Sequence, residues 1–329
     1  MLKYCIKRIL LSLLILFGVS VILYVLVRTM PVSYFENLVA NNIAGGSSAV
    51  DFEAEVNKMK EYYGLDGSIL EGYIGWLKSF VQGDFGKSYV QGKPVEDVIF
   101  ENMGVSFAIS FVSLILQLII AIPLGIKCAC NQYGKLDYTV TVLTMIGISF
   151  PTFFFGSIVI KFFALDLGWF PVGGLPAEMP TAITDWSRIV DLLLHLVLPI
   201  TVLVVLSIGS LMRYTRTNTL EVLTADYIRT ARAKGLSERS VIYKHVFRNS
   251  LIPLVTVLAG TLPSLFGGAM ITETIFAIPG IGKIAYDAMM GGDVPFIMGY
   301  NMFLAVLTVV GILLTDIMYA VVDPRVKLS

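Results

Sequence analysis

The chain has 329 residues, of which 56% are hydrophobic and 15% are charged, and its mean hydropathy is +0.79. A soluble domain averages about 45–50% apolar and about 25% charged residues. The apolar residues here are gathered into runs of about 18 or more, which a water-soluble fold cannot cover, so a soluble enzyme is excluded. Because the 24 basic and 24 acidic residues balance, nucleic acid is not an expected partner.

The first apolar run extends from Ile9 to Val27 and follows three basic residues. It is long enough, at about 1.5 Å per residue, to cross most of a bilayer core about 30 Å thick. No small-residue cleavage site follows it, so we expect a retained span and not a signal peptide. Five further spans are predicted at Val105 to Ile126, Tyr138 to Phe163, Leu192 to Met212, Leu251 to Ile275 and Ile297 to Val322. The sequence therefore predicts an all-α membrane protein with six transmembrane helices.

Most of the 24 Lys and Arg residues fall on the side of the membrane that holds the N-terminus. By the positive-inside rule both termini are predicted to be cytoplasmic. Cys5, Cys128 and Cys130 then lie on or near the reducing side. They are too few for a disulfide framework, and Cys128-x-Cys130 lacks the second ligand pair of a zinc site. We therefore expect this chain to bind no metal or other cofactor itself.

Residues 31–101, here called the outer subdomain, are too many for a bare connection and contain helix punctuation. Asp51 is predicted to cap a helix that runs to Tyr63 and stops at Gly64, and Ser68 to cap an amphipathic helix ending near Gly83. The expected domains are residues 1–30 with the first span, the outer subdomain, and a five-span core over 102–329. A second outer loop is expected from residue 168 to residue 191, which is rich in Pro and Gly.

Five prolines lie within or at the ends of the predicted spans. Each removes one backbone hydrogen bond and bends its helix. They indicate either ordinary membrane kinks or a bundle that is built to bend or to line a cavity, and the sequence leaves both open. The five are Pro123, Pro151, Pro199, Pro253 and Pro263.

No catalytic motif is present in the sequence. Gly86-Lys87-Ser88 invites a P-loop interpretation, but the pattern requires a glycine where Val81 stands, and the tripeptide lies in the outer subdomain. The only two histidines are expected on opposite sides of the membrane, which leaves no histidine-based metal cluster. We therefore expect a chain that is not an enzyme.

Two ionisable residues, Glu273 and Asp316, fall inside predicted spans, where a charge costs about 2.5–3.5 kcal/mol on insertion scales. Either can serve a transport path, or can snorkel or form a structural pair. We prefer the structural interpretation for Asp316 and leave both open for Glu273.

Residues 213–250 form the most informative segment. Asp226 or Thr224 is predicted to cap a short helix through Lys234, Gly235 to supply a left-handed stop, and Ser237 to cap a second helix. One side of these helices is apolar and the other is basic. A pair of amphipathic helices on the membrane surface would explain that pattern, but the small residues before the glycine favour close approach of another protein.

The run from Tyr227 to Leu236, continuing from Arg248 to Pro253, resembles the coupling loop of permease subunits of ATP-binding-cassette importers, in the form of the dipeptide, oligopeptide and nickel permease family. We call residues 213–250 the coupling loop. Further motifs that resemble the family are Gly64-Leu65-Asp66, Gly83-Asp84-Phe85-Gly86-Lys87-Ser88, Pro94-Val95, Ile122-Pro123-Leu124-Gly125, Ser149-Phe150-Pro151, Thr272-Glu273-Thr274-Ile275-Phe276, Pro279-Gly280-Ile281-Gly282 and Asp323-Pro324-Arg325-Val326.

The sequence departs from the family pattern in two places. The Glu-Ala-Ala triplet of the coupling loop stands here as Arg229-Thr230-Ala231, so the role of that glutamate does not carry over. After the first span, Met30-Pro31-Val32-Ser33 replaces the more usual turn.

The resemblance implies a permease subunit of a binding-protein-dependent importer of oligopeptides or dipeptides. Its implied partners are a second homologous permease, two cytoplasmic ATP-binding subunits that use ATP and Mg, an extracytoplasmic solute-binding protein and membrane lipid. Residues expected to contact the ATPases are Asp226, Arg229, Thr230, Ala231, Lys234, Gly235 and Leu236. Glu273, Pro151 and Gly268 are expected on the translocation path. Alternatives are import of nickel or another small solute, or a stand-alone secondary transporter.

Overall fold

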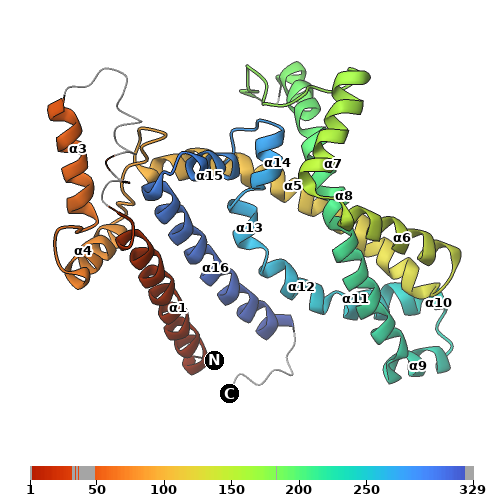
Figure 1. Cartoon of the computed structure of the whole chain (residues 1–329). Helices are drawn as coiled ribbons and strands as arrows, with labels where there is room; N and C mark the ends of the chain where they lie inside the picture. Colours follow the sequence, from red (N-terminus) through yellow and green to blue (C-terminus); the bar gives the residue numbers. More distant parts are fainter. Residues whose placement is uncertain (1, 32–33, 35, 37–48, 183, 323–329) are drawn as a thin grey trace.

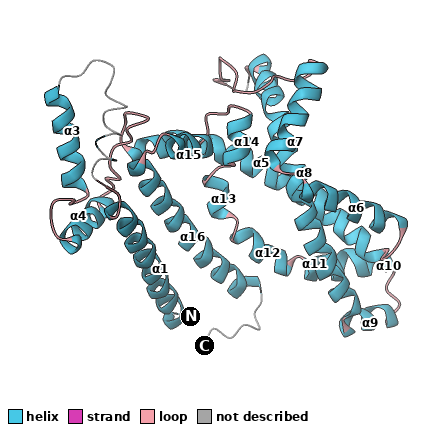
Figure 2. Ribbon diagram, in the orientation of Figure 1, coloured by secondary structure: helices cyan, strands magenta, loops and turns pink. Residues whose placement is uncertain are grey.

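The computed structural model describes residues 2–31, 34, 36, 49–182 and 184–322. This part of the chain is almost entirely helical (Figure 2), and its only extended pairing is an isolated bridge between Lys87 and Pro94. Val32-Ser33 and the motif from Asp323 to Val326 lie outside the described residues. The helices are α1 (Leu2–Arg28), α3 (Ala49–Tyr62), α4 (Ile69–Val81), α5 (Val95–Cys130), α6 (Lys135–Ser149), α7 (Thr152–Val159), the π-helix η1 (Ile160–Asp166), α8 (Trp186–Thr224), α9 (Asp226–Ala233), α10 (Glu238–Ser240), the π-helix η2 (Val241–Val246), α11 (Phe247–Ser250), α12 (Ile252–Ala259), α13 (Leu262–Phe266), α14 (Met270–Ile275), α15 (Ile281–Met290) and α16 (Val294–Val322).

Among the described residues, four helices are long and apolar enough to cross a membrane: α1, α5, α8 and α16. A fifth span is formed if α6 and the helix that follows it count as one bent unit. The expectation of an all-α membrane protein agrees with this architecture. The number of six spans and the side on which the termini lie stay predictions.

The predicted span from residue 138 to residue 163 is not one straight helix. The chain bends by 102° between α6 and the α7–η1 unit. Phe150 is extended, with φ −78° and ψ 129°, because a residue before proline is displaced from the helical region, and Pro151 then starts α7. The bend therefore follows from the sequence pair at its centre.

The predicted span from residue 251 to residue 275 is wrong as a continuous helix. It consists of three short helices, α12, α13 and α14, with breaks near Gly260 and at Gly267-Gly268 (Figure 1). Pro263 lies in the first turn of α13 and Gly268 has φ +76°, a value that ends a right-handed helix. This stretch has an apolar composition but lacks a continuous ladder of backbone hydrogen bonds.

Helices α1 and α16 lie side by side and run antiparallel (Figure 1). Arg8 near the start of α1 lies 3.2 Å from Asp316 near the end of α16, measured from guanidinium nitrogen to carboxylate oxygen. The structural pair that was preferred for Asp316 is therefore present. Farther along the chain, α5 and α8 pack along each other, and both continue as helices past Pro123 and Pro199.

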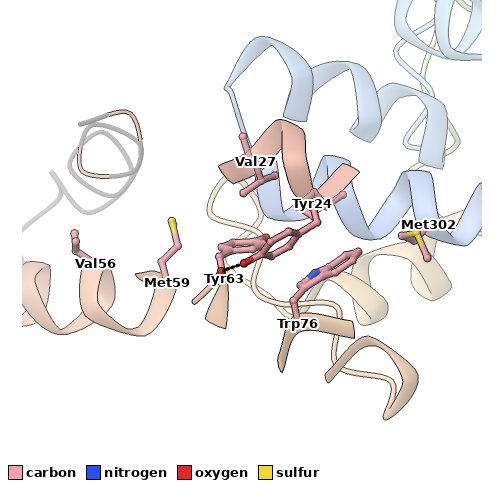
Figure 3. Packing of buried hydrophobic residues seen from close by; sticks show 9 residues of the cluster. Tyr24, Val27, Val56, Met59, Tyr63, Trp76 and Met302 are labelled. Carbon is pink, nitrogen blue, oxygen red and sulfur yellow. Dashed lines mark hydrogen bonds between the residues drawn. The ribbon is translucent and has the colours of Figure 1, made fainter. Parts of the chain in front are cut away.

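The outer subdomain shares its apolar core with α1 and α16 (Figure 3). Tyr24 of α1 donates a hydrogen bond of 2.7 Å to the carbonyl of Tyr63, and its ring lies against Trp76 of α4. α5 begins at Val95, so this helix crosses the domain boundary expected at residue 101. The domain division stays a prediction. The buried residues of this core are Tyr24, Val27, Val56, Met59, Tyr63, Trp76, Val294, Met298 and Met302.

The helix signals within the outer subdomain have mixed outcomes. Ser68 caps α4, since its hydroxyl accepts a hydrogen bond of 3.2 Å from the amide of Glu71, as predicted. Gly64 follows α3 with φ +58°, as its predicted role requires. Asp51 is not a cap, because α3 already begins at Ala49. The outer loop predicted to end at residue 191 ends earlier, because α8 starts at Trp186.

Candidate functional site

The coupling loop begins as the last turns of α8, which remains helical to Thr224. Ala225 is extended, with φ −69° and ψ 145°, and redirects the chain into α9. Asp226 is the first helical residue of α9 and Thr224 the last of α8, so neither caps α9 as predicted. The acidic side chain of Asp226 still lies in the first turn, where it complements the helix dipole.

A small apolar core holds the coupling loop together. Ile228 and Ala231 of α9 are buried against Val241 and Val246 of η2, and Val222 at the end of α8 packs beside them. Ala231 therefore faces the inside of the loop and not its surface. The loop is a folded unit on the end of α8, because α9, η2 and the end of α8 share this core.

The turn between α9 and α10 is built as predicted. Gly235 has φ +76°, and Ser237 accepts a hydrogen bond from the amide of Ser240. Arg232 spans this turn and donates to both carboxylate oxygens of Glu238, at 2.7 and 3.1 Å. These hydrogen bonds lower the pKa of Glu238 and raise the pKa of Arg232. The turn is thus held by a forked ion pair as well as by backbone geometry.

The surface of the coupling loop is basic with apolar residues interspersed. Of the residues predicted to contact an ATPase, all except Ala231 are exposed. A Cβ at Gly235 would meet no atom within 4 Å, so the turn presents bare backbone to its surroundings. The exposed residues of this surface include Asp226, Tyr227, Arg229, Thr230, Arg232, Lys234, Gly235, Leu236, Glu238, Arg239, Tyr243 and Lys244. Such a surface suits a protein partner with acidic groups and an apolar pocket.

An ion pair that the sequence analysis did not predict joins the first residues of the coupling loop to α6. Arg216 of α8 donates to both carboxylate oxygens of Asp137, each at 2.7 Å, and the amide of Tyr133 donates to the same carboxylate. Its partners are 79 positions apart in sequence. The only sequence signal was an acidic residue directly before the predicted span that begins at residue 138.

Glu273 lies in a second polar cluster, between α14 and α15. Its carboxylate is 1% exposed and accepts hydrogen bonds from the amides of Ala269 (2.9 Å) and Lys283 (3.0 Å). Three glycines leave room for this carboxylate. A Cβ at Gly280 would lie 2.4 Å from a carboxylate oxygen, and a Cβ at Gly268 or Gly282 would lie nearly as close to one. The hydroxyl of Ser106 on α5 accepts a hydrogen bond of 2.9 Å from the amide of Ile281.

The structure brings Glu273 and Gly268 into this one cluster. Pro151 lies instead at the bend before α7, which packs against α14. The assignment of these three residues to a translocation path stays a prediction, as does the contact of the coupling loop with ATPases. No group of three potential metal-ligating side chains occurs in the described part of the chain.

A third junction missed from the sequence lies where α16 begins. Asp293 is fully buried and accepts hydrogen bonds from the hydroxyl of Ser88 (2.6 Å) and the amide of Val90 (3.0 Å). Its other oxygen accepts from the amide of Phe296, the usual geometry of a helix cap. Asp293 directly before Val294-Pro295 was an available signal for this helix start.

Known proteins resemble this chain over its whole length. Oligopeptide transport system permease protein AppB of Bacillus subtilis is 40% identical over 99% of this chain and 100% of its own. Dipeptide transport system permease protein DppB of the same bacterium is 34% identical over 100% of this chain and 99% of its own. A putative peptide permease protein of Brucella suis is 35% identical, with 100% of both chains covered.

The fold also has a solved counterpart. A chain from the inward-facing MetNI methionine ABC transporter superposes with a TM-score of 0.54, at 21% identity, over 69% of this chain and 96% of its own. The family model for inner membrane components of binding-protein-dependent transport systems matches residues 121–328, which include the coupling loop, the Glu273 cluster and α16. The chain belongs to this family of inner membrane transport components.

Proposed function

We propose that this chain is a transmembrane permease subunit of an ATP-driven, binding-protein-dependent importer of oligopeptides or dipeptides. The proposed substrate class rests on the 40% identity with an oligopeptide permease over nearly the full length of the chain. The chain is a multi-pass protein of the cell membrane and is not itself an ATPase. Separate cytoplasmic subunits hydrolyse ATP with Mg.

The coupling loop is the part of the chain that would contact an ATPase subunit. Its exposed surface and its folded core favour a rigid docking element, and Gly235 allows a partner to reach the backbone. In this proposal Asp226, Arg229 and Lys234 make charged contacts with the ATPase subunit, and Thr230 and Leu236 contribute shape complementarity. Ala231 holds α9 in place from inside the loop.

Movement of the coupling loop would reach the membrane through α8. This helix is continuous from Trp186 to Thr224, and the Asp137–Arg216 pair ties it to α6. Closure of the ATPase pair would therefore move α6 and α8 together against the remaining helices. The expected result is alternating access through a discrete rearrangement of packed helices.

The proposed topology has six membrane crossings and cytoplasmic termini. The sixth crossing requires the broken stretch α12–α13 to pass through the membrane among other helices, where exposed backbone groups find partners inside the protein. The outer subdomain would then offer the surface on which a solute-binding protein docks. A second homologous permease and two ATPases complete the proposed assembly.

Two alternatives from the sequence are not favoured. Nickel or another small solute lacks support from the oligopeptide and dipeptide permeases that resemble the chain. A stand-alone secondary transporter needs an ion relay, yet Asp316 is paired with Arg8 and the Glu273 carboxylate is occupied by backbone amides.

The test is purification of this chain from native membranes, followed by ATPase assays with and without a peptide-loaded binding protein. We expect ATPase subunits to co-purify and their activity to rise with the loaded binding protein. A chain that purifies without an ATPase and transports after ATP depletion would overturn the proposal.

A further inference from the structure

Helix α4 of the outer subdomain has an exposed apolar stripe that none of the described residues covers. Leu70 is 68% exposed, Ile74 is 56% exposed and Val81 is 77% exposed. Their spacing of four and seven residues, with half-buried Leu77 between the last two, puts them on one side of the helix. A stripe of this kind on a helix of 13 residues requires an apolar neighbour.

The position of α4 is fixed by contacts with the first membrane span. The Tyr73 hydroxyl lies 2.8 Å from the hydroxyl of Ser20, and the Tyr73 ring meets Phe17 edge to face with centroids 6.2 Å apart. Ser20 lies about 12 Å along the helix axis from Arg28, where α1 ends. The Tyr73 side chain therefore extends well inside the apolar length of α1.

The exposed stripe lies next to Tyr73 around α4. At about 100° per residue, Leu77, Leu70, Val81 and Ile74 follow Tyr73 in order around the helix. The polar residues Lys78 and Glu71 come next around the helix, followed by Ser79, which lines a cavity shared with α3. The stripe is therefore adjacent to Tyr73 on the surface of α4, and Tyr73 itself contacts the apolar length of α1.

Polar groups lie where the contact between α1 and α4 reaches Arg28, at the end of α1. The guanidinium of Arg28 donates to the carbonyls of Gly64 (2.8 Å) and Gly67 (2.6 Å), in the turn before α4. A charged residue at the end of a span is typical of the level of lipid head groups. α4 therefore starts beside the Arg28 end of α1.

We propose that α4 is an interfacial helix whose Leu70–Ile74–Val81 stripe is embedded in lipid, in the leaflet that surrounds the Arg28 end of α1. Lipid is the occupant because the stripe adjoins a face of α1 that is itself exposed. Leu10, Leu14 and Phe17 recur at spacings of four and three on that face, and Phe17 touches Tyr73. The outer subdomain is then anchored to the bilayer by α4 as well as by α1. The inference requires that α1 span the membrane and is independent of what the transporter carries.

The test places the photoreactive residue benzoylphenylalanine at single positions of the full-length chain in native membranes. Positions 70 and 74 report on the stripe, and positions 71 and 79 on the polar side of the same helix. On irradiation we expect lipid adducts, identified by mass spectrometry, at 70 and 74 and a loss of these adducts at 71 and 79. Membrane abundance equal to that of the unmodified chain is the folding control.

Two results would overturn the proposal. Cross-links from positions 70 and 74 to another protein would assign the stripe to a subunit interface, and equal absence of adducts at all four positions would place α4 in water. If a photoreactive variant does not accumulate, Leu70→Cys and Glu71→Cys are compared with a membrane-impermeant maleimide in intact cells. Slower labelling at 70 than at 71 is expected, and equal labelling contradicts an embedded stripe.

Discussion

Arg216 donates hydrogen bonds of 2.7 Å to both carboxylate oxygens of Asp137, and this ion pair joins the start of α6 to the last turns of α8. The Asp137 side chain is only 4% exposed, so its charge is stabilised by Arg216 and by the amide of Tyr133. In the proposed mechanism, this pair makes α6 and α8 move together when the coupling loop moves.

Arg216→Ala should destabilise the protein by about 3 kcal/mol, the lower end for a buried pair because Arg216 is partly exposed. Thermal unfolding of the detergent-solubilised chain measures the effect. The Asp137→Ala, Arg216→Ala double variant should lose less than the sum of the single variants, since no charge is then left unpaired. Arg213→Ala, exposed on the same helix, is the matched control. Strictly additive losses would contradict a coupled pair.

Gly235→Arg should abolish peptide uptake and leave membrane insertion intact. The site has φ +76°, which costs an L-residue about 1–2 kcal/mol, and the new side chain would cover the exposed turn. Uptake of labelled peptide and abundance in the membrane are measured together. Gly168→Arg, at a glycine outside the coupling loop with φ +63° and equally open surroundings, should transport normally. Wild-type uptake by the Gly235→Arg variant would remove the coupling loop from its proposed role.

Glu273→Gln should lower stability because glutamine has one acceptor oxygen where two backbone amides need partners. Leaving one buried amide unpaired costs about 1–3 kcal/mol. Asp287→Asn is the control, because Asp287 is a partly exposed acid on neighbouring α15 that pairs with Lys283.

Uptake by the same Glu273→Gln variant separates two roles for this residue. A changed KM for peptide at unchanged thermal stability would support its place on the translocation path. A loss of stability with an unchanged KM would assign it to holding the α14–α15 turn. Unimpaired transport with normal stability would exclude both roles.

Asp293→Ala should loosen the outer subdomain from the start of α16. The substitution removes the acceptor for the Ser88 hydroxyl and the Val90 amide and leaves both donors unsatisfied. Limited proteolysis of the purified chain should cut the outer subdomain faster than in the wild type. Asp66→Ala, at an exposed acid of the same subdomain, should leave the cleavage rate unchanged. Equal protection in both variants would show that the apolar core around Trp76 suffices.

Local signals in the sequence were enough for several features of the fold. Long apolar runs marked α1, α5, α8 and α16, because a bilayer core requires that length of uninterrupted apolar helix. Ser68, Ser237 and Gly235 marked a helix start or stop correctly, since a cap or a left-handed turn depends on residues within a few positions. The motifs of the coupling loop, read in order, also led to the correct family.

Local sequence signals predicted some helix caps wrongly, and they could not identify contacts between residues that are distant in the sequence. Asp51 and Thr224 have good capping side chains, yet Asp51 lies inside α3 and Thr224 is the last residue of α8. Apolar composition alone could not show that residues 251–275 break into three helices, because hydropathy does not report backbone hydrogen bonding.

The sequence by itself determined that this is an apolar helical protein with a folded, basic coupling loop. Only the tertiary structure decided that Asp137 meets Arg216, that Glu273 is occupied by the amides of Ala269 and Lys283, and that Asp293 joins the outer subdomain to α16. These pairs form because packed helices bring distant side chains within hydrogen-bond distance, and a buried polar group is stable only where such a partner is present.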